Sequence, residues 1–276
     1  MLESILLMKG ILKFIVGLLL AAVSLVTYWC NTQENEFTGE KQHVDMTVEQ
    51  EIALGLQAAP EMAEQYGGLH PDREAAQAVK DIGQQLVQNS RVSNTPYNFE
   101  FHLLADDQTV NAFALPGGQI FITGGLLKRL NSEAQLAGIL GHEIGHVVAR
   151  HSAEQLAKAK LTQGLTGAAA IATYDPENPA SRGGAVVAAM VGKLLNMRYG
   201  RNDELESDRL AVQLTGSAGY DPRAMMEVMR ILEEASGGAG GPEFLQTHPN
   251  PGNRISQIEQ AIQEEYPNGL PENLRQ

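Results

Sequence analysis

The segment His142-Glu-Ile-Gly-His146 has the residue types and the spacing of a catalytic zinc site. Residues four apart on a helix share a face, so the imidazoles of His142 and His146 can bind the same metal ion. Glu143 lies about 100° around the helix from His142, where its carboxylate can take a proton from a water on the metal. Because zinc held in this way also polarises a peptide carbonyl, the segment predicts a zinc metallopeptidase with one Zn²⁺ per chain.

A catalytic zinc ion requires a third protein ligand. His151 is the next histidine, but on a continuing helix it lies about 180° from His142 and faces away. The metzincin spacing requires a glycine at position 149 and a histidine at 152, where this chain has Ala149 and Ser152. The metzincin subclass is therefore excluded.

The acidic segment 201–211 contains the better candidate for the third ligand. If the segment is helical, Glu204 and Asp208 share a face, so Glu204 can bind zinc while Asp208 accepts the free imidazole N–H of a ligand histidine. Glu206 is the competing ligand, but no carboxylate follows it four residues later. A solvated acidic helix face is the ordinary explanation for such a run. The histidine pair already in place favours the ligand role for Glu204.

Capping signals and apolar spacing predict the helices that position these residues. Ser132-Glu-Ala-Gln135 has the form of a capping box, and apolar residues at helical spacing follow it beside the two histidines. Gly138, Gly141 and Gly145 lower the helix propensity of this segment, which indicates close approach by another element or by substrate. Further helices are expected over 47–66, 72–88, 126–130, 221–235 and 254–264, and two helical stretches around a long covering loop over 161–195.

The predicted strands cluster in one part of the chain. Apolar and polar residues alternate over 97–104, and the runs 110–115 and 119–123 flank Pro116-Gly-Gly118 as the arms of a hairpin. Helices are predicted on both sides of this cluster. The sequence therefore predicts an α+β fold, mainly helical, with a small antiparallel sheet and an active-site helix that carries residues 142–146.

Composition excludes one class of partner and one kind of cross-link. The net charge is −13 and no basic stripe offsets it, so binding to nucleic acid is not expected. Cys30 is the single cysteine, which excludes an intramolecular disulfide.

The N-terminus is predicted to be a targeting segment. Lys9 and Lys13 precede an uncharged, mostly apolar run over 14–26, which is typical of a signal peptide. Extending the run to 11–29 gives a marginal membrane anchor. Cys30 stands where a bacterial lipoprotein is acylated, although Thr27-Tyr-Trp29 lacks the small residues that this signal usually has.

Lipid attachment at Cys30 is favoured over an uncleaved anchor helix and over simple secretion. All three alternatives place the chain outside the cytoplasm, and attachment places it on the periplasmic side of a bacterial membrane. The expected organisation is a signal or anchor segment over 1–30, a polar tether over 31–45 and a zinc metallopeptidase domain over 46–276.

Several separated motifs together resemble the gluzincin metallopeptidases of the HtpX, BepA, LoiP and CAAX prenyl protease type, most of all their bacterial lipoprotein and periplasmic members. The resemblance covers about 47–262, nearly the whole mature chain. Besides 142–146 and 204–208, it rests on Asn111–Gly118, Thr123–Leu126, Ala218–Pro222 and Thr247–Pro249 with Arg254. Ser207 stands where the family commonly has alanine, which is a minor departure.

The resemblance implies a gluzincin fold and a role for each matching residue. His142, His146 and Glu204 would bind zinc, and Glu143 would act as general base and then as general acid. Asp208 would hold a ligand histidine. The remaining roles fall to His248, which would stabilise the oxyanion or mask the zinc at rest, and to Arg254, which would pair with the site carboxylates.

The strand over 119–123 is similar to the edge strand on which this family binds substrate by β-addition, a mode that tolerates many peptide sequences. The resemblance therefore assigns substrate binding to Asn111, Gly118, Gln119, Ile120 and Phe121.

The favoured function is a zinc-dependent metalloendopeptidase of the bacterial cell envelope that acts in protein quality control on unfolded, misfolded or misassembled proteins. The alternative is a periplasmic chaperone or assembly factor with a masked or latent protease site. Masking would need the covering segment 161–195 and the glycine-rich segment 237–241. An intramembrane prenyl-protein protease would need several long apolar spans, whereas this sequence has at most one.

Overall fold

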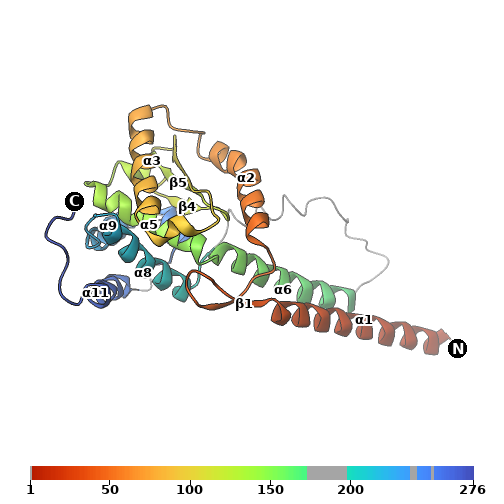
Figure 1. The fold of residues 1–276 in the computed structure, drawn as a ribbon. Helices are drawn as coiled ribbons and strands as arrows, with labels where there is room; N and C mark the ends of the chain where they lie inside the picture. The colour runs from red at the N-terminus through yellow and green to blue at the C-terminus, as the bar shows by residue number, and fades with distance from the viewer. Residues whose placement is uncertain (1, 173–197, 237–240, 250–251) are drawn as a thin grey trace. The chain divides into compact units, whose positions relative to one another are not determined.

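The computed structural model describes residues 2–172, 198–236, 241–249 and 252–276 (Figure 1). The chain forms two compact units, one from residues 1–46 and 153–193 and the other from residues 47–152 and 194–276. The domain boundaries expected at 30 and 45 stay a prediction. Every residue to which the sequence assigns chemistry at the zinc site lies in the second unit.

The first unit contains the apolar N-terminal helix α1 (Leu2–Cys30). Its segment Ile11–Cys30 is long and apolar enough to cross a membrane by length and composition. Helix α6 (His151–Ala172) contributes its residues from 153 onward to the same unit. Most of the long loop expected within 161–195 lies outside the described residues. Residues 237–240 of the glycine-rich segment 237–241 also lie outside them.

The polar segment 31–45 is a hairpin and not the aperiodic tether that its composition predicts. Strands β1 (Thr32–Glu34) and β2 (Lys41–His43) pair antiparallel. The side chain of Asn35 accepts the backbone N–H groups of residues 37 and 38, and Gly39 has a φ of 78°. This local turn chemistry closes the hairpin without an apolar pattern, so a search for apolar periodicity misses it.

The sheet of the second unit has the strand order β3-β5-β4. Strands β4 (Ala112–Ala114) and β5 (Gln119–Thr123) form the predicted antiparallel hairpin. Strand β3 (Glu100–Leu104) joins the other side of β5 in parallel, so the sheet is mixed. Figure 1 shows this small sheet among the helices, in agreement with the predicted α+β class. Strand β5 is central and buried along its whole length.

The turn between β4 and β5 requires glycine. Gly117 has a φ of 83°, and a Cβ atom there would lie 2.3 Å from the Cα of Ile52 in α2 (Val48–Gln65). No larger residue fits between the turn and α2, so the close approach of their backbones depends on Gly117.

Predicted caps start the helices around the sheet. Thr47 and Gln50 form a capping box at α2, and the Asp72 side chain accepts two N–H groups of α3 (Arg73–Gln88). Further helices of this unit are η1 (Arg91–Asn94), α4 (Gly124–Leu127), α9 (Ala224–Ala235), α10 (Glu243–Thr247) and α11 (Arg254–Glu265).

Helices α5 (Glu133–Val148) and α8 (Arg201–Ser217) pack closely and carry most of the site. Ser132 caps α5 through the N–H of Gln135, while the Gln135 side chain accepts from Asn131. A Cβ atom on Gly145 would lie 3.1 Å from the Cα of Ser207. The helices therefore approach as closely as the glycines of α5 suggest, and α8 is the approaching element.

Candidate metal centre

The two histidines of α5 point to one place inside the protein. His142 and His146 are 0% and 1% exposed, and their Nε2 atoms lie 3.0 Å apart. Helical spacing aligns the two rings, and the apolar residues of α5 bury that face.

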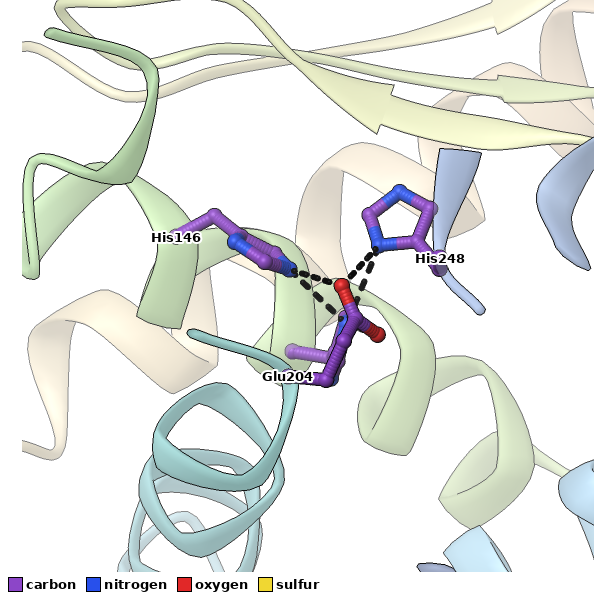
Figure 2. Close-up of side chains that lie close together, drawn as sticks. His146, Glu204 and His248 are labelled. Atoms are coloured by element: carbon purple, nitrogen blue, oxygen red, sulfur yellow. Dashed lines mark hydrogen bonds and ion pairs between the residues drawn. The ribbon is translucent and has the colours of Figure 1, made fainter. Parts of the chain in front are cut away.

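Two further donors reach the same place from distant parts of the chain. Glu204, on α8, lies 3.5 Å from His146 Nε2 through Oε1 and 3.6 Å from His142 Nε2 through Oε2. His248 follows α10, and its Nδ1 lies 3.2 Å from Glu204 Oε1 and 3.4 Å from His142 Nε2. Figure 2 shows His146, Glu204 and His248 converging from three separate elements.

This donor set fits zinc. One atom from each of the four residues lies within 4.8 Å of the others, and all four side chains are buried. Donors of a tetrahedral zinc ion, with bonds of about 2.0–2.2 Å, lie about 3.3–3.6 Å apart. Three histidine nitrogens and one carboxylate oxygen are also donor types that zinc binds readily in proteins.

Glu143 is the buried carboxylate beside the donors. It is 0% exposed, and neither of its oxygens accepts a hydrogen bond from a described residue. Its Oε1 lies 3.7 Å from His248 Nε2. Burial raises the pKa of Glu143, and the nearby His248 and His142 partly offset that rise. A buried carboxylate with free acceptors and a raised pKa is suited to receive a proton.

Asp208 and Arg254 contact the donors His142 and Glu204 from outside the group of four. Asp208 Oδ1 lies 2.9 Å from His142 Nδ1, on the side of the ring opposite to Nε2. The buried Arg254 guanidinium contacts both oxygens of Asp208, through Nε at 2.8 Å and Nη2 at 2.5 Å. Its Nη1 lies 3.0 Å from Glu204 Oε2. One cation therefore compensates two buried carboxylates.

The electrostatic environment gives His142 and His146 different pKa values. Burial alone would lower the pKa of His142, but hydrogen bonds to Asp208 and Glu204 raise it to about 9. Burial holds the pKa of His146 well below its usual range. The pKa of Glu204 lies well below its ordinary value because His248 and the hydrogen bonds from the histidines outweigh burial. Without metal, His142 therefore holds a proton at neutral pH that His146 lacks.

The family follows from comparison with known proteins. The family model of peptidase family M48 matches residues 73–262, which contain all the residues described above. The chain belongs to peptidase family M48.

Relatives in this family include bacterial and mitochondrial proteases. The beta-barrel assembly-enhancing protease of Escherichia coli (strain K12) is 32% identical over 191 residues, which cover 65% of this chain and 37% of the relative. A mitochondrial metalloendopeptidase OMA1 of Arabidopsis thaliana is 35% identical over 58% of this chain and 31% of the relative. The OMA1 protein of Schizosaccharomyces pombe is 28% identical over 91% of this chain and 72% of the relative. The chain thus matches well under half the length of the first two.

His151 does not face away from the M48 site, so that prediction is wrong. Helix α5 ends at Val148, and Arg150 adopts a left-handed conformation with a φ of 58°. This left-handed residue ends the course of α5 and places His151 Nδ1 2.9 Å from His146 Nδ1. His151 is buried but lies outside the group of four donors. The prediction fails because α5 does not continue through residues 149–151.

The prediction that residues 119–123 form an edge strand is also wrong. Strand β5 is paired on both sides, so Gln119, Ile120 and Phe121 cannot accept an added strand, and the Gly118 carbonyl already accepts from Glu100. The Asn111 side chain is buried and donates to Glu243 Oε1 at 3.0 Å and to the Tyr66 hydroxyl at 3.2 Å. Alternation of apolar and polar residues identifies the β4–β5 hairpin, but it does not determine whether β3 pairs with β4 or with β5.

Two aromatic residues line the site without a signal in the sequence. Tyr199 stacks on His146 with ring centroids 3.9 Å apart, and its hydroxyl lies 2.9 Å from Ser152 Oγ. Phe244 stacks on His248 at 4.4 Å. Neither residue belongs to a helical pattern around the metal motif, so only the structure shows that they pack against His146 and His248.

Proposed function

We propose that this chain is a zinc metalloendopeptidase of the bacterial cell envelope that degrades misfolded or misassembled proteins. The observation that carries the proposal is the convergence of four buried donors beside the buried carboxylate of Glu143, whose oxygens accept no hydrogen bond from a described residue. Membership of family M48 and the protease names of the relatives support it.

In this proposal His142, His146 and Glu204 hold the metal. Zinc, when bound there, supplies the positive charge that polarises the scissile carbonyl and acidifies water. Glu143 accepts the proton of the attacking water on its carboxylate and then delivers it to the leaving amide nitrogen. Arg254 and Asp208 keep the ligands in place, since Asp208 accepts from His142 Nδ1 and Arg254 balances the charge.

We assign substrate binding to the edge of β4. The Asn111 carbonyl accepts from Thr123 N and Leu115 N donates to the Gln119 carbonyl, so the peptide groups of Ala112 and Ala114, which alternate with these, face the opposite edge of β4. An extended peptide paired there is recognised through its backbone, which suits unfolded substrates of varied sequence.

The N-terminal helix supports attachment at the periplasmic side of a membrane. Ile11–Cys30 meets the length and apolarity of a span, and Cys30 is exposed at its end, where a lipid could be attached.

A latent site is the second candidate, and the position of His248 favours it. With Nδ1 3.2 Å from Glu204 and 3.4 Å from His142, His248 occupies the place of a fourth ligand, which a structural zinc site has and a catalytic one lacks. In this case the chain serves chiefly as a chaperone or assembly factor. Rescue of an envelope defect in a deletion strain by Glu143→Gln would support it.

Glu143→Gln tests the enzymatic proposal. Because the general base is lost while the ligands remain, we expect full zinc occupancy and a fall of at least about 100-fold in cleavage of casein by the full-length chain. Glu133→Gln, on the exposed first turn of the same helix, is the control and should cleave at the wild-type rate. Wild-type activity in Glu143→Gln would contradict the mechanism.

A further inference from the structure

His151 is a buried histidine that neither the ligand set nor the proposed mechanism uses. It is 2% exposed, and both ring nitrogens lie near polar atoms. Its Nδ1 lies 2.9 Å from His146 Nδ1 and 3.4 Å from Ser207 Oγ. Its Nε2 lies 3.2 Å from Glu206 Oε2. Such contacts on both sides of a ring determine where its proton resides.

The turn before His151 is built to bring this ring to the site. Arg150 is the only non-glycine residue with positive φ in the described part of the chain, and its Nε donates to Glu51 Oε1 at 2.7 Å. Glu51 is itself buried, on α2. A continuing α5 would carry His151 to the opposite face, so the left-handed residue and its ion pair are what place His151 against His146.

The contacts of His146 fix the direction of each hydrogen bond. His146 Nε2 faces the donor set, 3.0 Å from His142 Nε2 and 3.5 Å from Glu204 Oε1. A neutral imidazole that binds metal through Nε2 carries its proton on Nδ1. His151 Nδ1 must therefore accept that proton's hydrogen bond, which leaves the proton of His151 on Nε2, where it is donated to Glu206.

We propose that His151, supported by Glu206, is the positioning residue for the ligand His146, as Asp208 is for His142. The inference rests on the ligand role of His146 in the proposed function. Ligand histidines usually donate their second N–H to a carboxylate, a carbonyl or water, whereas here a neutral histidine is the acceptor. This explains why Glu206, two residues after Glu204 on α8, does not join the donors. Its carboxylate instead accepts from His151, which contacts the proposed ligand His146.

Zinc affinity of the full-length chain in detergent tests the proposal. Loss of an orienting partner typically weakens metal binding 10–100-fold, so His151→Ala should raise the zinc dissociation constant by about that factor in competition with a chelator. His151→Asn should recover most of the affinity, because its Oδ1 replaces the acceptor Nδ1. Ile139→Ala, which removes buried apolar volume on α5, is the control for packing and should lower stability without weakening zinc binding.

Equal zinc affinity in wild type and His151→Ala would overturn the inference, and so would His151→Asn binding as weakly as His151→Ala. A wild-type chain that binds no zinc would instead overturn the proposed function itself.

A measurement on the wild type does not depend on how the variants fold. In the zinc-loaded chain with ¹⁵N-labelled histidine, two-bond couplings report which nitrogen of each ring is protonated. We expect the proton on Nδ1 of His146 and on Nε2 of His151. A proton on Nδ1 of His151, alone or together with one on Nε2, would overturn the inference.

Discussion

His142 and His146 are neighbours on one helix face, yet their surroundings give them different affinities for protons. Asp208 and Glu204 lie against His142 and raise its pKa to about 9 despite burial. Burial dominates at His146, and the neighbouring His142 and His151 lower its pKa further. Burial lowers the pKa of both rings, and at His142 the adjacent carboxylates reverse that effect, so a proton competes with metal more strongly there.

Zinc uptake should release a proton from His142. Because its pKa is raised to about 9, the ring is protonated below that pH, so apparent zinc affinity should rise about tenfold per pH unit up to about pH 9. Calorimetry at pH 7 in buffers of different ionisation enthalpy should report about one proton released per zinc. Asp208→Asn should reduce that number, since it removes the carboxylate that raises the pKa. Proton-free binding by the wild type would contradict this prediction.

At the scale of elements, the close packing of α5 and α8 sets the geometry of the donors. His142 and His146 lie on one helix and Glu204 on the other, so the separation of the helices controls the distance between the proposed ligands. The glycines of α5 permit this separation, at a cost in helix propensity of roughly 1 kcal/mol each relative to alanine.

Gly145→Ala should weaken zinc binding and lower stability by about 1–3 kcal/mol despite the better helix propensity of alanine. The new Cβ would lie 3.1 Å from Ser207 Cα and 3.2 Å from its carbonyl oxygen, and a helix backbone cannot yield as a side-chain end can. Denaturant unfolding and chelator competition measure the two effects.

Gly141→Ala is the matched control on the same helix. Its Cβ would meet Ala211 Cα at an ordinary 3.4 Å, so this variant should be neutral or more stable. If both variants behaved alike, the close approach at Gly145 would not be what positions the donors.

At the scale of the whole molecule, the donor set ties together segments that are far apart in the chain. His248 and His142 are separated by 106 residues, and Glu204 lies between them in the sequence. A metal that binds only the folded arrangement stabilises the unit that contains all four donors. That unit does not include the N-terminal helix.

Metal removal should therefore destabilise the second unit. Chelation should lower the unfolding midpoint of the zinc-loaded chain. If free zinc had been 1,000 times its dissociation constant, the free energy of unfolding should fall by about 4 kcal/mol. Zinc should restore the midpoint and magnesium should not, because the donors are nitrogen-rich. Glu204→Ala should bind zinc substoichiometrically under the same conditions. Stoichiometric zinc in that variant would reject Glu204 as a ligand.

Local physics made much of this protein predictable from sequence alone. Spacing of four residues aligns His142 with His146 and Glu204 with Asp208, because helical periodicity needs no tertiary information. Capping residues such as Thr47 and Asp72 mark helix starts for the same reason. The β4–β5 hairpin follows from its glycine-containing turn.

Only the tertiary structure decided what lies next to these local units. The insertion of β5 between β3 and β4 and the arrival of His248 beside Glu204 depend on packing between segments remote in sequence. The position of His151 depends on one left-handed residue, Arg150, held by an ion pair to Glu51 on another helix. Residue spacing specifies which side chains share a face, whereas burial and long-range pairing determine which faces meet, and here their meeting completes the metal centre.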